Sequence, residues 1–406
     1  MSSGDTAWVL GATALVMLMT PALGFFYGGL VREKNVLATI MQSFFILCLI
    51  SVQWVLFGYS LAFGPDHGHL IGGLDWFGLN GVGLTPNKAY APTIPAQAFM
   101  AFQMMFAVIT PAIITGGFAE RKRFKAFVLF SLLWATFIYD PLAHWVWGVN
   151  GWIRNLGALD FAGGTVVHIS SGTAALVAAL MLGRRLTVGH QATEPHDATK
   201  TILGASLLWF GWFGFNAGSA LAANGLAVSA FVVTNTATAM AGLTWMTLSW
   251  VYHKQPSVLG VAAGAVAGLV AITPASGFVD PMGALLIGVG AGAACFGAAQ
   301  LKPWLKVDDT LDVFAVHGVG GMWGALATGL FATVAVNSAG NNGAFFGNPH
   351  QLLVQAIAVV ATVAFSGAGT FVILKVVDVL VGLRVHPEEE LVGLDRSQHG
   401  ELAYQH

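Results

Sequence analysis

Eleven apolar runs, each long enough to cross a lipid bilayer, constrain this chain more than any other feature of its sequence. A spanning helix needs about 20 mostly apolar residues, and short polar segments separate the runs from one another. We therefore expect an all-α membrane protein with eleven transmembrane helices. The runs cover approximately residues 7–30, 36–63, 97–118, 124–144, 163–182, 199–220, 227–252, 257–274, 280–301, 312–333 and 350–383.

Composition excludes the main alternatives to a membrane protein. Hydrophobic residues make up 56% of the 406 residues and charged residues only 9%, which is not the balance of a soluble domain. The net charge of -2 is uninformative about nucleic acid, but the chain has no basic block, so we expect no nucleic-acid partner. Cys48 and Cys295 both fall inside apolar runs, so we expect no disulfide.

The positions of the basic residues predict the orientation in the membrane. Nearly all of the 17 Lys and Arg residues fall in one alternate set of loops, whereas the other set holds only Lys88 and Arg154. Because basic loops stay in the cytoplasm, we expect the N-terminus outside and the C-terminus inside, in the cell membrane. The last run is longer than a bilayer requires, which predicts a strongly tilted or bent helix. The residues after it, 384–406, should form a short cytoplasmic tail.

Two histidines, far apart in the sequence, each stand at the head of a ridge of small residues. His168 and His317 are followed at offsets of four, seven and eleven by Gly172, Ala175 and Ala179, and by Gly321, Gly324 and Thr328. Asp160 precedes the first ridge and Asp312 the second. A single histidine in an apolar helix is often a packing residue, but two matching ridges favour a shared site. A metal site is disfavoured because no third ligand lies near either ridge.

The two ridges belong to a weak internal repeat. The third and eighth runs share the sequence Ile-Thr-Pro-Ala, at 109–112 and 272–275, and the ridges lie in the fifth and tenth runs. Since each half contains five spans, the halves would be inverted relative to each other, an arrangement typical of transporters with a site near the midplane. We predict one repeat at about 7–182 and another at about 199–333. The eleventh helix, at about 350–383, completes a transmembrane domain of residues 1–383.

Aromatic residues gather in the outer halves of three spans. Phe102 and Phe106 are four residues apart in the third run, and Trp147 lies near the outer end of the fourth. Trp212, Phe215 and Ser219 share one face of the sixth. Such stripes are also common in cores and at membrane interfaces.

Several stretches give the chain a close resemblance to the ammonium transporter (Amt/Rh) family, and in particular to its Amt branch. They are FYGG (26–29), GFAERKRF (117–124), DFAGGTVVH (160–168), GWFGFNAGSA (211–220), DDTLDVFAVHG (308–318) and GLRV (382–385), in the order of the family. The resemblance implies a homotrimer in which each subunit has its own pore. It implies no enzymatic activity, cofactor or metal. It also implies transport of ammonium or ammonia, with methylammonium as an analogue, and regulation by a P-II class signal protein at the cytoplasmic face.

The resemblance also implies a role for each candidate residue. Trp147, Phe106 and Ser219, with Phe102 beside them, would form the outer recruitment site, and Phe106 and Phe215 would close the pore below it. His168 and His317 would line the pore and relay a proton. Asp160, Asp312 and Trp212 would support these residues structurally.

Elementary electrostatics favours the same assignment. Aromatic faces attract a small cation by roughly 0.5–2 kcal/mol each, and a serine hydroxyl can accept one of its N–H groups. Moving a bare ion into an apolar lumen costs far more, on the order of 20 kcal/mol in the idealised limit. Deprotonation avoids that cost, and imidazoles can accept or relay the proton.

Three other functions fit parts of the sequence. The first is a sensor of the Amt type that binds ammonium without conducting it. The second is a neutral-gas channel of the Rh type, although Trp147 and the outer aromatics favour the Amt branch. The third is an assembly protein with a closed lumen, which the paired histidine ridges argue against.

Overall fold

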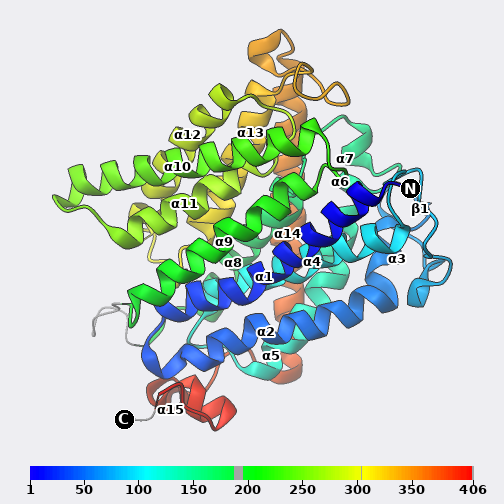
Figure 1. The fold of residues 1–406 in the computed structure, drawn as a ribbon. Helices are drawn as coiled ribbons and strands as arrows, with labels where there is room; N and C mark the ends of the chain where they lie inside the picture. The colour runs from blue at the N-terminus through cyan, green and yellow to red at the C-terminus, as the bar shows by residue number, and fades with distance from the viewer. Residues whose placement is uncertain (187–194, 303, 405–406) are drawn as a thin grey trace.

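Eleven helical segments run side by side through the bundle in the part of the chain that the structure, a computed structural model, describes: residues 1–186, 195–302 and 304–404 (Figure 1). Five of them form the first half. They are α1 (Ser3–Leu30), α2 continued by η2 and α3 (Val36–Phe63), α4 (Ala96–Ile114), α5 continued by η5 and α6 (Phe124–Trp147), and η6 with α8 (Gly164–Leu182). The eleven predicted runs match the observed segments closely, and the prediction of an all-α membrane protein is confirmed.

The second half also contains five helical segments. Its segments are α9 (Ala198–Gly218), α10 (Gly225–His253), α11 (Val258–Ile272), α12 (Pro281–Leu301) and η7 with α13 (Phe314–Phe331). The eleventh segment, α14 (His350–Val381), is a single helix of 32 residues. Figure 1 shows it crossing behind α1 and α9 at a steep angle, so the extra length of the last run reflects tilt.

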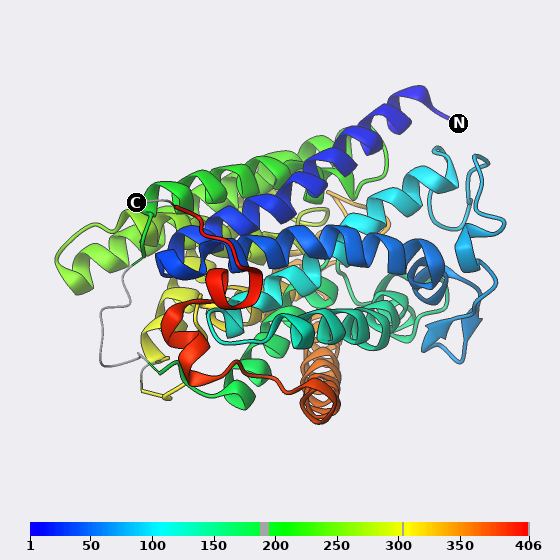
Figure 2. The same cartoon turned by 90° about the horizontal axis from the view of Figure 1, so that it is seen from below.

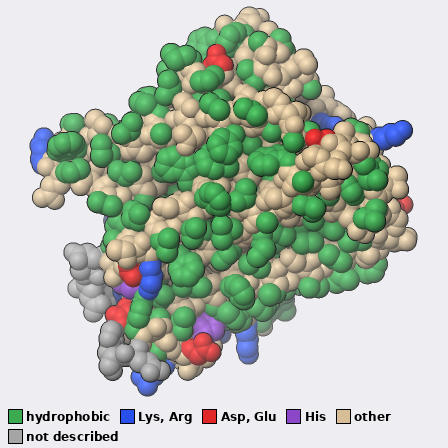
Figure 3. Space-filling view, in the orientation of Figure 1, with side chains coloured by type: hydrophobic (Ala, Val, Ile, Leu, Met, Phe, Trp, Pro, Cys, Tyr) green, Lys and Arg blue, Asp and Glu red, His purple; other side chains and the backbone are tan. Residues whose placement is uncertain are grey.

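The two ends of the bundle carry different loops. We call one end the Trp147 side; it holds the N-terminus, the short hairpin of β1 (Asp66–His67) and β2 (Ile71–Gly72), and α7 (Trp152–Asn155). We call the other end the Arg185 side; it holds the basic loops and the C-terminal tail. Apolar side chains cover most of the surface between the two ends, as expected for lipid contact (Figure 3).

The tail packs against the Arg185 side (Figure 2). It contains α15 (Pro387–Val392) and η9 (Asp395–His399), and its last two residues, 405–406, lie outside the described part of the chain. The Asp395 carboxylate accepts hydrogen bonds from the N–H groups of Leu37 (3.0 Å) and Ala38 (2.8 Å) at the start of α2. Arg384 forms an ion pair with Glu390 (2.8 Å). The tail is therefore folded onto the bundle.

Small residues allow the two halves to meet at their fifth and tenth segments. A Cβ atom added to Gly172 would lie 2.2 Å from the backbone nitrogen of Gly318, and one added to Gly321 would lie 3.1 Å from the Cβ of His168. Gly172 and Gly321 each stand four residues after a ridge histidine, so the contact is reciprocal. We call this contact the glycine seam. It brings the two histidine-bearing segments together along their backbones.

Candidate functional site

Both histidines lie on segments with a wider, π-helical turn. His168 is in η6 (Gly164–Ile169) and His317 is in η7 (Phe314–Val319). Such turns are rare and often mark functional sites, although η2, η5 and η9 are π-helical as well and carry none of the site residues. The Nδ1 atoms of the two rings are 3.2 Å apart, and both residues are buried. One ring must therefore donate its Nδ1–H in a hydrogen bond to the Nδ1 lone pair of the other, because two lone pairs or two N–H groups cannot form this contact.

Rings from α9 and α4 stack above the histidine pair, toward the Trp147 side. The indole of Trp212 lies nearly parallel to the His168 ring, with centroids 5.4 Å apart, and donates a hydrogen bond to Thr273 Oγ1 (2.9 Å). Phe215 follows, 5.9 Å from His168, and Phe106 lies 4.3 Å from Phe215. The two phenyl rings therefore stand between the histidines and the Trp147 side, as the sequence predicts for a gate.

A cavity of about 210 Å³ opens beyond the two phenyl rings. Phe106, Trp147 and Ser219 line it, as predicted. Ser219 donates its hydroxyl proton to the carbonyl oxygen of Phe215 (2.8 Å), which leaves its oxygen lone pairs to accept a hydrogen bond in the cavity. Trp147 donates its indole N–H to the Asp160 carbonyl oxygen (2.9 Å), so its ring face remains for a cation. We call this space the aromatic cavity.

Phe102 does not line the aromatic cavity, contrary to its predicted contact with substrate. It is completely buried, and its ring packs edge-on against Phe106 at 5.0 Å. A Cβ atom added to Gly218 would meet this ring, so the ring fills the space between α4 and α9. Phe102 lies four residues before Phe106, one helical turn, and so lies behind the gate ring.

Nine further residues line the aromatic cavity, and Gln103 and Phe161 are two of them. The Gln103 side-chain oxygen accepts no hydrogen bond from any described residue and could accept one from a donor in the cavity. In the sequence, the position of Gln103 directly after Phe102 pointed to this location. Phe161 directly follows Asp160 and packs against Phe278 (5.7 Å). Arg154 borders the cavity as well, but its exposed guanidinium donates to the Trp147 carbonyl oxygen (2.7 Å).

Asp160 connects the aromatic cavity to the first histidine. Its carboxylate accepts the N–H groups of Gly163 (2.7 Å), Gly164 (2.6 Å) and Thr165 (2.8 Å), and also the Thr165 hydroxyl. These groups belong to the first turn of the segment that carries His168, where a carboxylate is most effective. Gly163 is in the left-handed region (φ 115°), which lets the chain turn sharply into this helix. The arrangement fits the predicted structural role.

The predicted support by Asp312 takes a different form. Asp312 is partly exposed and forms an ion pair with Lys302 (2.5 Å). The carboxylate that accepts an N–H group at the start of η7 is that of Asp309, bonded to Phe314 (2.7 Å). Burial raises the pKa of Asp309 to about 6, and the charge of Asp312 adds to the effect. Asp309 lies eight residues before His317, as Asp160 lies eight before His168, and this spacing was the missed signal.

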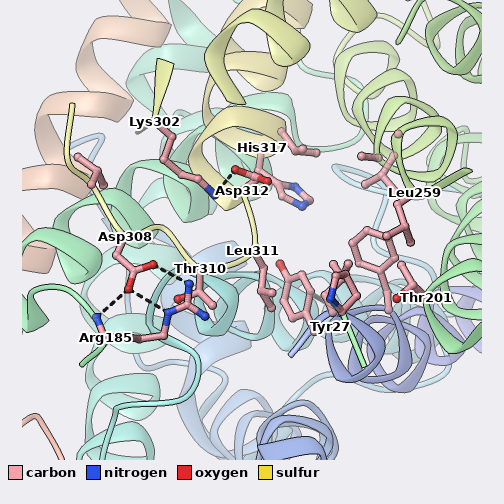
Figure 4. A pocket seen from close by; sticks show the side chains of 18 of the residues that line it. Tyr27, Arg185, Thr201, Leu259, Lys302, Asp308, Thr310, Leu311, Asp312 and His317 are labelled. Carbon is pink, nitrogen blue, oxygen red and sulfur yellow. Dashed lines mark hydrogen bonds and ion pairs between the residues drawn. The ribbon is translucent and has the colours of Figure 1, made fainter. Parts of the chain in front are cut away.

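A cavity of about 530 Å³ opens on the Arg185 side and reaches His317. Figure 4 shows His317 beside Asp312, Lys302 and Leu311, with Arg185 and Asp308 paired at the edge. Arg185 bonds Asp308 (2.8 Å) and Glu120 (2.6 Å). Burial by itself would raise the pKa of Glu120, but the charges of Arg185 and Arg32 outweigh it and lower that pKa to about 2. We call this space the charged vestibule.

These contacts place the site residues in one line through the protein: aromatic cavity, paired phenyl rings, paired histidines, charged vestibule. No group of three or more His, Cys, Asp or Glu in the described residues is arranged to hold a metal ion. The line can therefore bind a small cation by ring faces and lone pairs and move a proton between imidazoles.

The chain is similar over nearly its whole length to several known proteins. The chain is 54% identical to the ammonium transporter of Bacillus subtilis over 406 residues, which is 100% of this chain and 99% of that protein. It is 51% identical to ammonium transporter Amt1 of Archaeoglobus fulgidus, covering 100% of both chains. The crystal structure of Saccharomyces cerevisiae Mep2 superimposes with a TM-score of 0.89 at 36% identity, covering 96% of this chain and 88% of that one.

A second solved structure carries a different functional name. A protein described as a sensor Amt protein superimposes with a TM-score of 0.90 at 32% identity, covering 98% of each chain. The sequence model of the Ammonium Transporter Family matches residues 7–404. The chain is thus a multi-pass membrane protein that belongs to the Ammonium Transporter Family.

Proposed function

We propose that this protein transports ammonium by binding the cation in the aromatic cavity and passing ammonia between the two histidines. The observation that carries the proposal is the contact of 3.2 Å between His168 and His317 at the end of an aromatic passage. An ion that loses its hydration shell there would need several polar partners, and the apolar walls supply few of them. Neutral ammonia needs far fewer.

In the proposed sequence of events, each residue has a distinct task. The ring faces of Trp147 and Phe106 attract the cation, and the Ser219 oxygen accepts one of its N–H groups. As Phe106 and Phe215 move aside, the cation transfers one proton to the histidine pair, and the remaining ammonia passes on. The histidine pair accepts ammonia through hydrogen bonds and offers a route for the proton. The Nε2 atom of His168, which contacts no polar atom of the described residues, is free for this task.

We propose further that the Trp147 side faces the cell exterior and that three copies of the chain form a trimer in the cell membrane. The distribution of Lys and Arg supports the orientation. Regulation by a P-II class protein at the Arg185 side stays a prediction, as does the division of the chain at residue 383. Deleting residues 384–406 and measuring both P-II binding and transport tests this prediction. Unchanged inhibition by P-II would contradict a role for the tail.

The experiment that tests the transport proposal uses purified protein in liposomes with an ammonium gradient. Current and internal pH are recorded together, with potassium as the control cation. We expect ammonium-driven uptake and no potassium current. Current with uptake indicates that the charge crosses, and uptake without current indicates a neutral channel.

The second candidate is a sensor that binds ammonium without conducting it. The likeness to the sensor Amt protein favours considering it. In the liposome experiment a sensor would give neither uptake nor current. Binding of methylammonium, measured by calorimetry on the same preparation, would then remain and separate a sensor from inactive protein.

A further inference from the structure

Two adjoining cavities lie along α5, η5 and α14, and neither contains any of the pore residues described above. The first is an apolar groove of about 510 Å³. We call it the α5–α14 groove. Leu133, Phe137, Ile138, Phe365, Ala368, Gly369, Val372, Ile373 and Val376 line it. Trp134 of α5 donates a hydrogen bond to Thr370 of α14 (2.9 Å) and so links the two helices that form the walls of the groove.

The second cavity, of about 470 Å³, lies at the Arg185 end of the same helices. We call it the basic cavity. Arg123 and Lys125 come from the start of α5, Leu380 and Val381 from the end of α14, and His386, Glu389 and Gln398 from the tail. It therefore has walls from the membrane helices and from the folded tail.

One stripe of α14 connects the two cavities. Phe365, Gly369, Val372 and Val376 line the groove, and Leu380, four residues further and 63% exposed, lines the basic cavity. Residues at this spacing share one helical face. With a rise of 1.5 Å per residue, the stripe from Phe365 to Val376 is about 16 Å long. Because α14 is tilted, the stripe spans less than this length in depth, which keeps it within one leaflet, half of the roughly 30 Å hydrocarbon thickness.

The charges of the basic cavity are not balanced within the protein. Among the described residues, neither Arg123 nor Lys125 forms an ion pair with a carboxylate. Arg123 instead donates to the carbonyl oxygen of Val381 (3.1 Å) and contacts the His386 ring (3.1 Å). The Glu389 carboxylate accepts hydrogen bonds from the His386 N–H group (2.9 Å) and the Gln398 side chain (2.5 Å). The cavity can thus receive a separate anion.

We propose that the basic cavity and the α5–α14 groove together bind one anionic phospholipid. Arg123 and Lys125 hold its phosphate-bearing headgroup, and one acyl chain lies in the groove between α5 and α14. A free phosphate would leave the adjoining apolar groove unexplained, whereas a lipid accounts for both cavities. Because His386 and Gln398 belong to the tail, the bound headgroup would also stabilise the folded tail.

Native mass spectrometry of the purified full-length protein tests the proposal without any transport measurement, so its outcome is independent of the proposed function. The protein is titrated with dioleoyl phosphatidylglycerol and with dioleoyl phosphatidylcholine, which have identical acyl chains. We expect tighter binding of the anionic lipid. The double variant Arg123→Gln/Lys125→Gln should weaken it more than tenfold, at about fivefold for each cation removed, and should leave phosphatidylcholine binding unchanged.

Two further variants distinguish binding at this specific lipid site from a general effect of surface charge. Lys254→Gln/Arg396→Gln removes the same charge from exposed positions of the Arg185 side that line neither cavity, and should keep wild-type binding. Ala368→Phe fills the groove at an exposed position and should weaken both lipids severalfold. If the double variant does not fold, the single variant Lys125→Gln, at an exposed residue, measures how much one positive charge contributes to binding of the anionic lipid.

Four outcomes would overturn the proposal. They are equal binding of the two lipids by the wild type, equal loss in the two double variants, no effect of Ala368→Phe, or full displacement of the lipid by sn-glycerol 3-phosphate at matched concentration. The last result would mean that the groove contributes nothing and that the basic cavity accepts a free phosphate group.

Discussion

The aromatic cavity and the charged vestibule, on the two sides of the histidine pair, handle charge in opposite ways. The aromatic cavity is small, about 210 Å³, and offers ring faces and lone pairs to a guest. The charged vestibule is larger, about 530 Å³, and four of its charged side chains form two ion pairs, Arg185 with Asp308 and Lys302 with Asp312. Ion pairs keep the wide charged vestibule in a fixed shape, whereas the unpaired hydrogen-bond acceptors of the aromatic cavity are available to a small cation. In the proposed function, discrimination between cations would therefore belong to the narrow end.

The strongest test of this difference removes the histidines that separate the two cavities. His168→Ala or His317→Ala should reduce ammonium-driven current on the order of 100-fold, the contribution typical of a positioned proton acceptor. His168→Asp should place a carboxylate in the lumen and convert ammonia passage into cation leakage. The measurement is ammonium current against potassium current in liposomes. If both alanine variants keep wild-type current and exclude potassium, the pair only packs.

The second test compares the carboxylates at the starts of the two histidine segments. The Asp160 carboxylate accepts five hydrogen bonds at the start of its segment, whereas the hydrogen bond of the Asp309 carboxylate at the start of η7 is with Phe314. Leaving a buried donor unsatisfied costs about 1–3 kcal/mol. Asp160→Ala should therefore lower the free energy of unfolding by about 3 kcal/mol or more, and Asp309→Ala by clearly less. Thermal unfolding in detergent measures both, and equal losses would remove the distinction.

A third, smaller effect should appear only at the narrow end. Trp147→Ala and Ser219→Ala should each weaken the apparent affinity for methylammonium about tenfold, or about 1–2 kcal/mol. Lys306→Gln, in the lining of the charged vestibule, is the matched control and should change affinity less than twofold. An unchanged affinity in both narrow-end variants would show that the aromatic cavity is not the recruitment site.

The smallest effect concerns the ring behind the gate. Because Phe102 supports Phe106 without lining the cavity, Phe102→Leu should change the affinity for methylammonium less than twofold. Phe106→Leu removes a ring that does line it and should have the larger effect. Initial uptake rates over a methylammonium series give both values. A larger loss of affinity from Phe102→Leu than from Phe106→Leu would show that Phe102 does belong to the binding site.

The sequence predicted the helical segments well because hydrophobic length is a local property that lipid imposes on each span separately. It also predicted that His168 and His317 meet, since both head ridges of small residues that allow close approach. The π-helical turns that carry them were not predicted, because no residue pattern in the sequence marks them. Phe102 was misplaced because helical spacing shows which residues share a face but not which one borders a cavity. Asp309 was missed because Asp312 stands nearer to His317 in the sequence.

The glycine seam has a consequence for how the protein can move. Transporters that work by alternating access rock one half against the other, which opens and closes the space between the halves. Here the backbones of the two halves touch at Gly172 and Gly318, beside the histidines themselves. A rocking motion would pull the imidazoles apart and break the contact on which proton transfer depends. The passage can then open only by local rotation of rings such as Phe106 and Phe215. In the proposed function, turnover would then depend on the motion of a few buried side chains rather than on the movement of domains.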